Sequence, residues 1–148
     1  MFPSIRDTLA IRHRSVRHAL EALGLEALVV THLPNIFYLT GFTGTAAIVV
    51  ITKTKVSVLT DFRYVAFVEG MLQDGRAWPD AALIRVDGPY DEALASFLEA
   101  LGVGRVGFEA AHLPVSRHRW LATRLRATEA PDREHQAHVT LVAVEGLI

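Results

Sequence analysis

Histidine is the residue type whose abundance first suggests chemistry, because seven of the 148 residues are histidines. Two of them, His135 and His138, lie three positions apart in a polar stretch that contains Glu134. The zinc-protease patterns need a further histidine either directly before that glutamate or three positions before it. Those positions are occupied by Arg133 and Pro131. We therefore predict no metal site in this chain.

Other catalytic patterns are missing from the sequence as well. There is no G-x-S-x-G nucleophile elbow, and the glycine-rich residues 41–45 match neither a P-loop nor G-x-G-x-x-G. We interpret Gly41 and Gly44 as a turn that needs glycine for a positive φ angle or for close packing. Asp91 and Glu92 begin a predicted helix, where negative charge is favourable. We predict no catalytic residue here.

One enzyme hypothesis stays open at this point. A small-molecule enzyme would use His32, His112 or His118 as its general base, because imidazole exchanges protons near neutral pH. The sequence names no residue that would orient any of these three rings. This hypothesis is therefore the weakest of the alternatives.

Helices and strands alternate along the chain, and these elements must position the histidines and carboxylates considered so far. Apolar residues at helical spacing predict helices over residues 5–23, 62–73 and 90–101, and Ser116 is expected to cap another. A capping-box pattern at Ser4 and Asp7 begins the first helix. Apolar runs predict strands over residues 25–31, 46–52, 55–60, 83–86, 105–109 and 139–144, with a loop at 32–35. The two strands joined by residues 53–54 should form a hairpin, so we expect an α/β domain with a mixed sheet.

Composition narrows the class of protein. A chain of 148 residues fits one domain with its own core, and 15 Lys and Arg against 16 Asp and Glu offer no basic field for nucleic acid or anionic membrane. No apolar run approaches the roughly 20 residues of a membrane-spanning helix. Cysteine is absent, which suits a reducing compartment. We expect a cytoplasmic protein without nucleic-acid or membrane partners.

Three segments carry more specific information. Residues 35–44 read Asn-Ile-Phe-Tyr-Leu-Thr-Gly-Phe-Thr-Gly, residues 59–64 read Leu-Thr-Asp-Phe-Arg-Tyr, and residues 105–109 read Arg-Val-Gly-Phe-Glu. Each resembles a signature segment of the N-terminal domain of the creatinase/prolidase family of Xaa-Pro peptidases. The order and spacing of the segments agree with that family over nearly the whole chain.

The resemblance implies a fold. The family's domain is a three-layer α/β sandwich with a ribonuclease H-like motif, in which helices flank a mixed sheet of about six strands. We expect residues 1–148 to be this domain alone, ending before the pita-bread catalytic domain begins.

The resemblance also implies a function for the parent protein, a metal-dependent Xaa-Pro dipeptidase or aminopeptidase that acts on short proline-containing peptides. Its two divalent ions (Mn, Co or Zn) are expected in the missing catalytic domain, so this chain alone should hold no cofactor and be inactive. The N-terminal domain would help to assemble a homodimer or tetramer, contact its own C-terminal catalytic domain, and shape the active-site cleft of a neighbouring subunit.

Six residues are the candidates, by that resemblance, to face the partner's cleft or an interface: His32, Asn35, Tyr38, Phe62, Arg63 and Tyr64. Several have a structural alternative. Tyr38 would be a buried aromatic residue with one backbone partner, Asn35 would bond to loop backbone, and Asp61 would cap a helix and pair with Arg63. Phe62 would either line a substrate pocket or pack into the core. Arg63 is the strongest candidate, because its planar guanidinium suits a carboxylate.

The second hypothesis for the whole chain belongs to a different class. The chain could be a free-standing α/β binding or interaction module that keeps the fold without peptidase activity. A reading frame that continues into a metal-ligand sequence would exclude this alternative.

Overall fold

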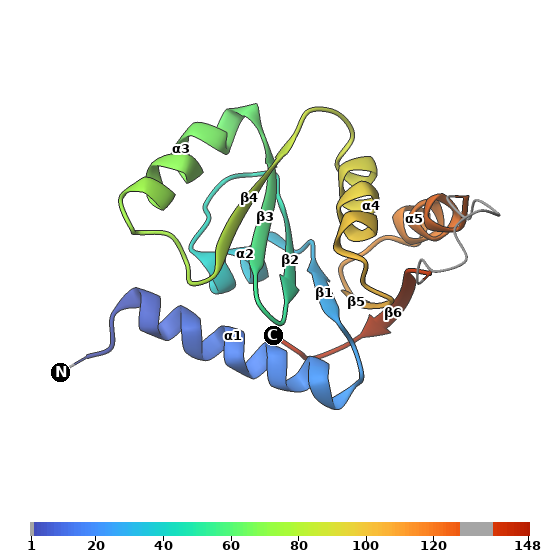
Figure 1. Cartoon of the computed structure of the whole chain (residues 1–148), viewed down its shortest axis with the longest axis horizontal. Helices are drawn as coiled ribbons and strands as arrows, with labels where there is room; N and C mark the ends of the chain where they lie inside the picture. The colour runs from blue at the N-terminus through green and yellow to red at the C-terminus, as the bar shows by residue number, and fades with distance from the viewer. Residues whose placement is uncertain (1, 128–137) are drawn as a thin grey trace.

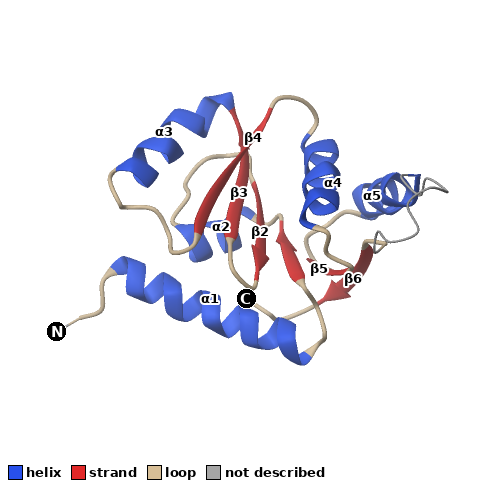
Figure 2. Cartoon of the chain, viewed as in Figure 1, coloured by secondary structure: helices blue, strands red, loops and turns tan. Residues whose placement is uncertain are grey.

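The computed structural model describes residues 2–127 and 138–148, which form one mixed sheet covered by helices on both faces (Figures 1 and 2). The elements follow in the order α1 (Ile5–Ala22), β1 (Ala27–Val30), α2 (Leu33–Thr40), β2 (Ile48–Thr52), β3 (Val56–Asp61), α3 (Phe62–Gln73), β4 (Ala81–Val86), α4 (Tyr90–Leu101), β5 (Arg105–Glu109), α5 (Val115–Ala127) and β6 (Thr140–Val144). In the part of the chain so described, no helix is both long and apolar enough to cross a membrane.

The sheet has the strand order β4-β3-β2-β1-β5-β6. Strand β2 pairs antiparallel with β1 and with β3, whereas β1–β5, β3–β4 and β5–β6 are parallel pairs. The remaining described strands therefore share one direction, and their carboxyl ends meet at one edge. The expected α/β class, the mixed six-stranded sheet and the hairpin of β2 and β3 are confirmed.

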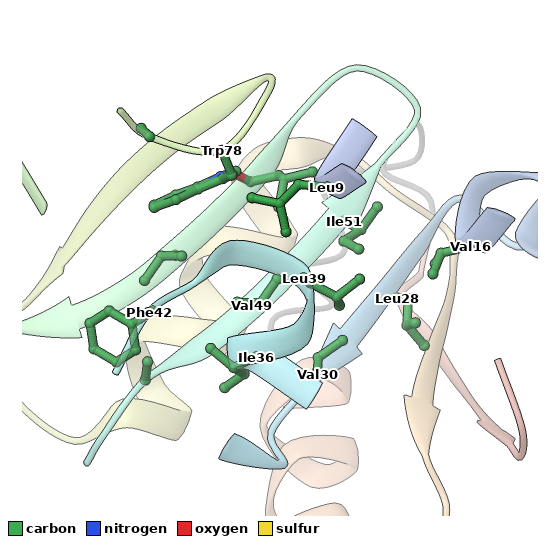
Figure 3. Close-up of a cluster of buried hydrophobic side chains, with 14 of the residues drawn as sticks. Leu9, Val16, Leu28, Val30, Ile36, Leu39, Phe42, Val49, Ile51 and Trp78 are labelled. Atoms are coloured by element: carbon green, nitrogen blue, oxygen red, sulfur yellow. The ribbon is translucent and has the colours of Figure 1, made fainter. Parts of the chain in front are cut away.

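One face of the sheet packs against α1, α2 and α3. Alternate residues of the central strands point to this face, among them Leu28, Val30, Val49 and Ile51, and they meet buried side chains of α1 and α2 (Figure 3). Val68 of α3 belongs to the same buried cluster. Trp78 is 1% exposed in the same cluster, and its indole N–H donates to the Val56 carbonyl oxygen at 2.7 Å. Each fully buried aliphatic side chain contributes roughly 1.5–3 kcal/mol, so this layer stabilises much of the fold.

The opposite face packs against α4 and α5. The other alternation of the strands supplies Val29, Ile48 and Val50, which meet Leu94 and Leu98 of α4 and two leucines of α5, Leu121 and Leu125. Arginines of α5 also bind carboxylates of α4: Arg117 binds Asp91, and Arg124 binds Glu92 and Glu99. Sequence patterns had suggested only a helix-dipole role for the first two acidic residues.

Helix α2 stands where the sequence suggested a loop at residues 32–35. It begins at Leu33, with Pro34 in its first turn, and ends at Thr40, where Gly41 caps it with a φ angle of 77°. Proline fits there because the first N–H groups of a helix have no intrahelical acceptor. The predicted loop at residues 32–35 is therefore wrong, because Pro34 lies in the first turn of a helix.

The beginning of α5 also differs from the expectation. The helix begins at Val115, and the His118 N–H donates to the Pro114 carbonyl oxygen at 3.0 Å. Ser116 therefore lies inside the first turn and is not the cap. At α1, by contrast, the capping box between Ser4 and Asp7 is confirmed.

Candidate functional site

Five of the six candidate residues, all except Tyr38, lie at the edge of the sheet where the strands that share one direction end. His32 and Asn35 follow β1, and residues 62–64 follow β3, which runs parallel to β1 through the antiparallel β2 between them. Ligands of open α/β sheets bind outside the carboxyl ends of strands, where the chain changes direction across the sheet. Folding therefore brings the first two signature segments to one edge.

Arg63 is held by Asp61 in a two-point ion pair. Its Nε donates to Asp61 Oδ1 and its Nη2 donates to Asp61 Oδ2, both at 2.8 Å. The Asp61 carboxylate also accepts the backbone N–H of Arg63 at 3.1 Å, which caps α3. The Arg63 hydrogen bonds hold the pKa of Asp61 well below its usual range, and Asp61 raises the pKa of Arg63. The predicted cap and ion pair are confirmed, and half of the Arg63 side chain stays exposed.

Tyr90 is a member of this site that sequence reasoning missed. It begins α4, and its hydroxyl donates to Asp61 Oδ2 in a short hydrogen bond and accepts the Asp61 backbone N–H at 3.1 Å. Burial, and then the Asp61 carboxylate, raise the pKa of Tyr90. Tyr90 lies outside the three signature segments, so nothing in the sequence linked it to Asp61.

Tyr64 fixes the turn at residues 41–45. Its hydroxyl accepts the Thr45 backbone N–H at 3.1 Å and is 2.5 Å from the Thr45 hydroxyl, contacts that lower the pKa of Tyr64. The Phe42 ring packs edge-on against Tyr64, with ring centres 5.5 Å apart. A Cβ on Gly44 would lie 2.3 Å from the Phe42 ring, and Gly41 has a positive φ angle. Both reasons given for the two glycines, close packing and positive φ, are confirmed.

Asn35 and the backbone of His32 bind Glu109, the last residue of β5. The buried Glu109 carboxylate accepts the N–H groups of Thr31 and His32 at 2.9 and 3.1 Å and the Asn35 side-chain amide at 2.5 Å. The expected bond from Asn35 to loop backbone is wrong, since a neighbouring parallel strand brings a carboxylate within reach. The third signature segment thus anchors the first.

The imidazole of His32 lies flat against that of His112, with ring centres 3.7 Å apart and planes inclined by 7°. His118, the third possible base, packs instead against the Phe108 ring. The structure therefore brings together two of the three histidines considered as bases.

Tyr38 and Phe62 do not lie in the core. Tyr38 is 42% exposed, and the Arg12 guanidinium of α1 lies 4.0 Å above its ring, so the expectation of a buried tyrosine is wrong. It faces outward because Ile36 and Leu39 occupy the buried side of the short helix α2. Phe62 is 73% exposed at the start of α3, so the core alternative is wrong and the pocket-lining alternative stays a prediction.

The candidates form two groups separated by a cleft of about 720 Å³. Phe62, Arg63 and Tyr64 form one group, and His32 with Asn35 forms the other. Tyr38 belongs to neither and lies against α1. None of the six candidates lines the cleft, although Thr45, the partner of Tyr64, and Tyr90, the partner of Asp61, do. The lining residues are Thr31, Leu33, Thr45, Ala46, Ala47, Ile48, Pro89, Tyr90, Asp91, Glu92, Ser116, Arg117 and Trp120.

Metal ligands are not assembled in the region covered by residues 2–127 and 138–148. No group of three or more His, Cys, Asp or Glu side chains is placed there to hold a metal ion. Of the histidine-rich segment considered above, Glu134 and His135 lie outside the described residues. The divalent ions implied by the family resemblance therefore do not fit the residues that the structure describes.

Comparison with known proteins agrees with this architecture. Residues 12–139 match the creatinase/prolidase N-terminal domain family. The uncharacterized peptidase YqhT of Bacillus subtilis strain 168 is 31% identical over 94 residues, which are 64% of this chain and 25% of that protein.

Two solved structures share the fold. A Xaa-Pro aminopeptidase from Streptococcus pyogenes has 30% identity and a TM-score of 0.72, covering 95% of this chain and 95% of that one. A Xaa-Pro dipeptidase from Bacillus anthracis has 22% identity and a TM-score of 0.73, covering 94% of this chain and 34% of that one. The chain thus spans a quarter of the curated relative and a third of the dipeptidase. With the match extending over most of its length, the chain belongs to the creatinase/prolidase N-terminal domain family.

Proposed function

We propose that this chain serves as the non-catalytic N-terminal domain of a metal-dependent Xaa-Pro peptidase. In this role it packs against its own C-terminal catalytic domain, supports a homodimer or tetramer in the cytoplasm, and shapes the active-site cleft of a neighbouring subunit. The substrates are short proline-containing peptides. Support comes from the family membership together with the greater length of two of the relatives, YqhT and the Bacillus anthracis dipeptidase.

The observation that carries the cleft-shaping role is the arrangement around Arg63. Guanidinium groups bind carboxylates with two parallel hydrogen bonds, and Asp61 occupies only one edge of this guanidinium. The side chain is half exposed beside the exposed Phe62 ring. An arginine held in this way is suited to a carboxylate of a bound peptide or of a neighbouring subunit.

The divalent ions belong, in this proposal, to the catalytic domain, where they would supply the hydrolytic chemistry. The first test is an assay of the 148-residue chain with Xaa-Pro dipeptides and added Mn²⁺, Co²⁺ or Zn²⁺. We expect no hydrolysis above background. Metal-dependent turnover by this chain would contradict the proposal and favour an independent enzyme.

The second test substitutes Arg63→Ala in a peptidase that carries this domain. We expect KM to rise or assembly to weaken while the metal content per subunit stays the same. Arg76→Ala is the matched control, because Arg76 also binds an aspartate two positions earlier, Asp74, but lies beyond the other end of α3. Loss of metal with normal assembly would refute the role given to Arg63. A gene in which no metal-ligand sequence follows this domain would favour the free-standing binding module.

A further inference from the structure

Tyr90 reaches the Arg63 site from the far side of the sheet. It begins α4, which covers the opposite face from α3, yet its hydroxyl meets the carboxylate that holds Arg63. We infer that Tyr90 is a positioning residue for Arg63: its hydroxyl fixes Asp61, and Asp61 fixes the guanidinium plane so that the outer edge is presented to a carboxylate ligand. This inference deepens the proposed function and rests on it only for the identity of the ligand.

The hydrogen bonds around Asp61 carry the first step. Oδ1 accepts the N–H and Nε of Arg63 at 3.1 and 2.8 Å, and Oδ2 accepts Nη2 of Arg63 at 2.8 Å. The second donor to Oδ2 is the Tyr90 hydroxyl, which also accepts the Asp61 N–H at 3.1 Å. Tyr90 therefore contacts both the backbone and the side chain of Asp61, and rotation of the carboxylate would break a bond to a charged acceptor.

The position of the phenol is itself restrained. Its oxygen lies 3.4 Å from the Ala46 carbonyl oxygen, which accepts the Thr60 hydroxyl at 2.8 Å. Tyr90 is partly buried and lines the cleft, and it packs against the core layer that contains α4. The group that orients Asp61 is thus anchored to a helix rather than to a surface loop.

The second step concerns the part of Arg63 that remains available. Arginine has five N–H donors, and Asp61 takes the one on Nε and one on Nη2. The edge formed by Nη1 and Nη2 has no hydrogen-bond partner among the described residues. Two parallel donors at a fixed angle match a carboxylate, so the ligand chemistry is a carboxylate that binds in a two-point geometry.

The experiment uses Tyr90→Phe in the 148-residue chain, with NMR of the Arg63 side chain and of the Asp61 carboxyl carbon. We expect exchange of the Arg63 Nε–H with water to become about tenfold faster, because a hydrogen bond to a charged acceptor is lost. The pKa of Asp61 should rise toward its ordinary value. Both measurements report on the chain of hydrogen bonds from Tyr90 through Asp61 to Arg63. A merely structural role of Tyr90 would change only the melting temperature.

Tyr64→Phe is the matched control, because it removes a second phenol hydroxyl of the same site that bonds Thr45 and not Asp61. It should leave the Asp61 pKa and the Arg63 exchange rate unchanged. Equal effects of the two substitutions, or no effect of Tyr90→Phe, would overturn the positioning role.

If Tyr90→Phe does not fold, Asp61→Asn supplies the second measurement. Loss of the carboxylate should lower the pKa of Tyr90, followed by phenolate absorbance, and an unchanged Tyr90 titration would also overturn the inference. These measurements need no substrate. If Arg63→Ala did not change KM in a complete peptidase, the result would therefore count against the proposed function. It would not affect the inference that Tyr90 positions Arg63 through Asp61.

Discussion

At the edge of the sheet where the candidate residues lie, single side chains are held by partners from distant parts of the chain. Asn35 and the N–H of His32 bind Glu109, which lies more than 70 positions later in the sequence. Asp61 binds its near neighbour Arg63, but it also binds Tyr90, 29 positions away. The local pairs could be predicted from spacing, whereas the distant partners could not, because they depend on which strands become neighbours.

His13 gives a residue-scale prediction about pH. Its side chain is buried, Nε2 donates to the Leu39 carbonyl oxygen at 2.6 Å, and Nδ1 has no partner among the described residues. Burial lowers the pKa of His13 below the ordinary value of about 6.5. The unfolded chain therefore binds a proton first as the pH falls, and the free energy of unfolding should decrease below about pH 6.5.

The test is urea unfolding of wild type and His13→Gln between neutral and mildly acidic pH. The glutamine amide can still donate to Leu39, so the variant should lose the His13 part of the pH dependence. His18→Gln is the control, because His18 is exposed on the same helix. An identical pH slope in wild type and His13→Gln would contradict the prediction.

Gly44 gives a second residue-scale prediction. Gly44→Ala should destabilise the domain by about 1–3 kcal/mol, because the new methyl group overlaps the buried Phe42 ring, which is packed against Tyr64. Gly70→Ala in α3, where a Cβ meets nothing within 4 Å, should instead stabilise by about 0.5–1 kcal/mol. Thermal or urea unfolding checks both values, and a neutral Gly44→Ala would show that the ring moves without cost.

At the scale of elements, α5 is joined to α4 by charge as well as by leucines. Arg124 lies between Glu92 and Glu99, which raise its pKa, and about a fifth of its side chain is exposed. The sequence predicted the α4 periodicity well but gave no partner for Glu99. The ion pair of Glu99 with Arg124 depends on where α5 packs, which local residue spacing does not specify.

Arg124→Ala should cost about 0.5–1 kcal/mol, since partly exposed ion pairs are screened by water. The loss should shrink in about 1 M salt, where the screening length falls to about 3 Å. Arg126→Ala, at an exposed position on the same helix, is expected to be neutral and controls for helix propensity. Equal losses for the two variants would show that the ion pairs do not join the helices.

At the scale of the whole molecule, one sheet connects two separate core layers. Trp78 reports on the layer beneath α1, α2 and α3, and the opposite layer contains Leu98 and Leu121. The same strands contribute alternate residues to both layers. Loss of packing in one layer would therefore also disrupt the strands on which the other layer packs.

The domain should therefore unfold in a single cooperative transition. Trp120→Phe leaves Trp78 as the sole tryptophan, so its fluorescence follows one layer while far-UV circular dichroism follows all helices. We expect the two urea curves to coincide. Curves with separate midpoints would indicate that the layers unfold independently.

The signature segments were sufficient to identify the family. The mixed α/β architecture, most strand and helix positions, the Asp61–Arg63 pair and the need for glycine at residues 41 and 44 could also be predicted from the sequence. These features follow from local spacing and backbone conformation, which neighbouring residues specify. The helix at residues 33–40 and the outward position of Tyr38 follow from Pro34 at the helix start and from the buried side of that helix, which are local features. The bond from Asn35 to Glu109 and the bond from Tyr90 to Asp61 could not be predicted from the sequence. Both contacts form because strands and helices that are far apart in the chain become neighbours in the sheet and its covering layers, and local residue patterns do not specify which elements become neighbours.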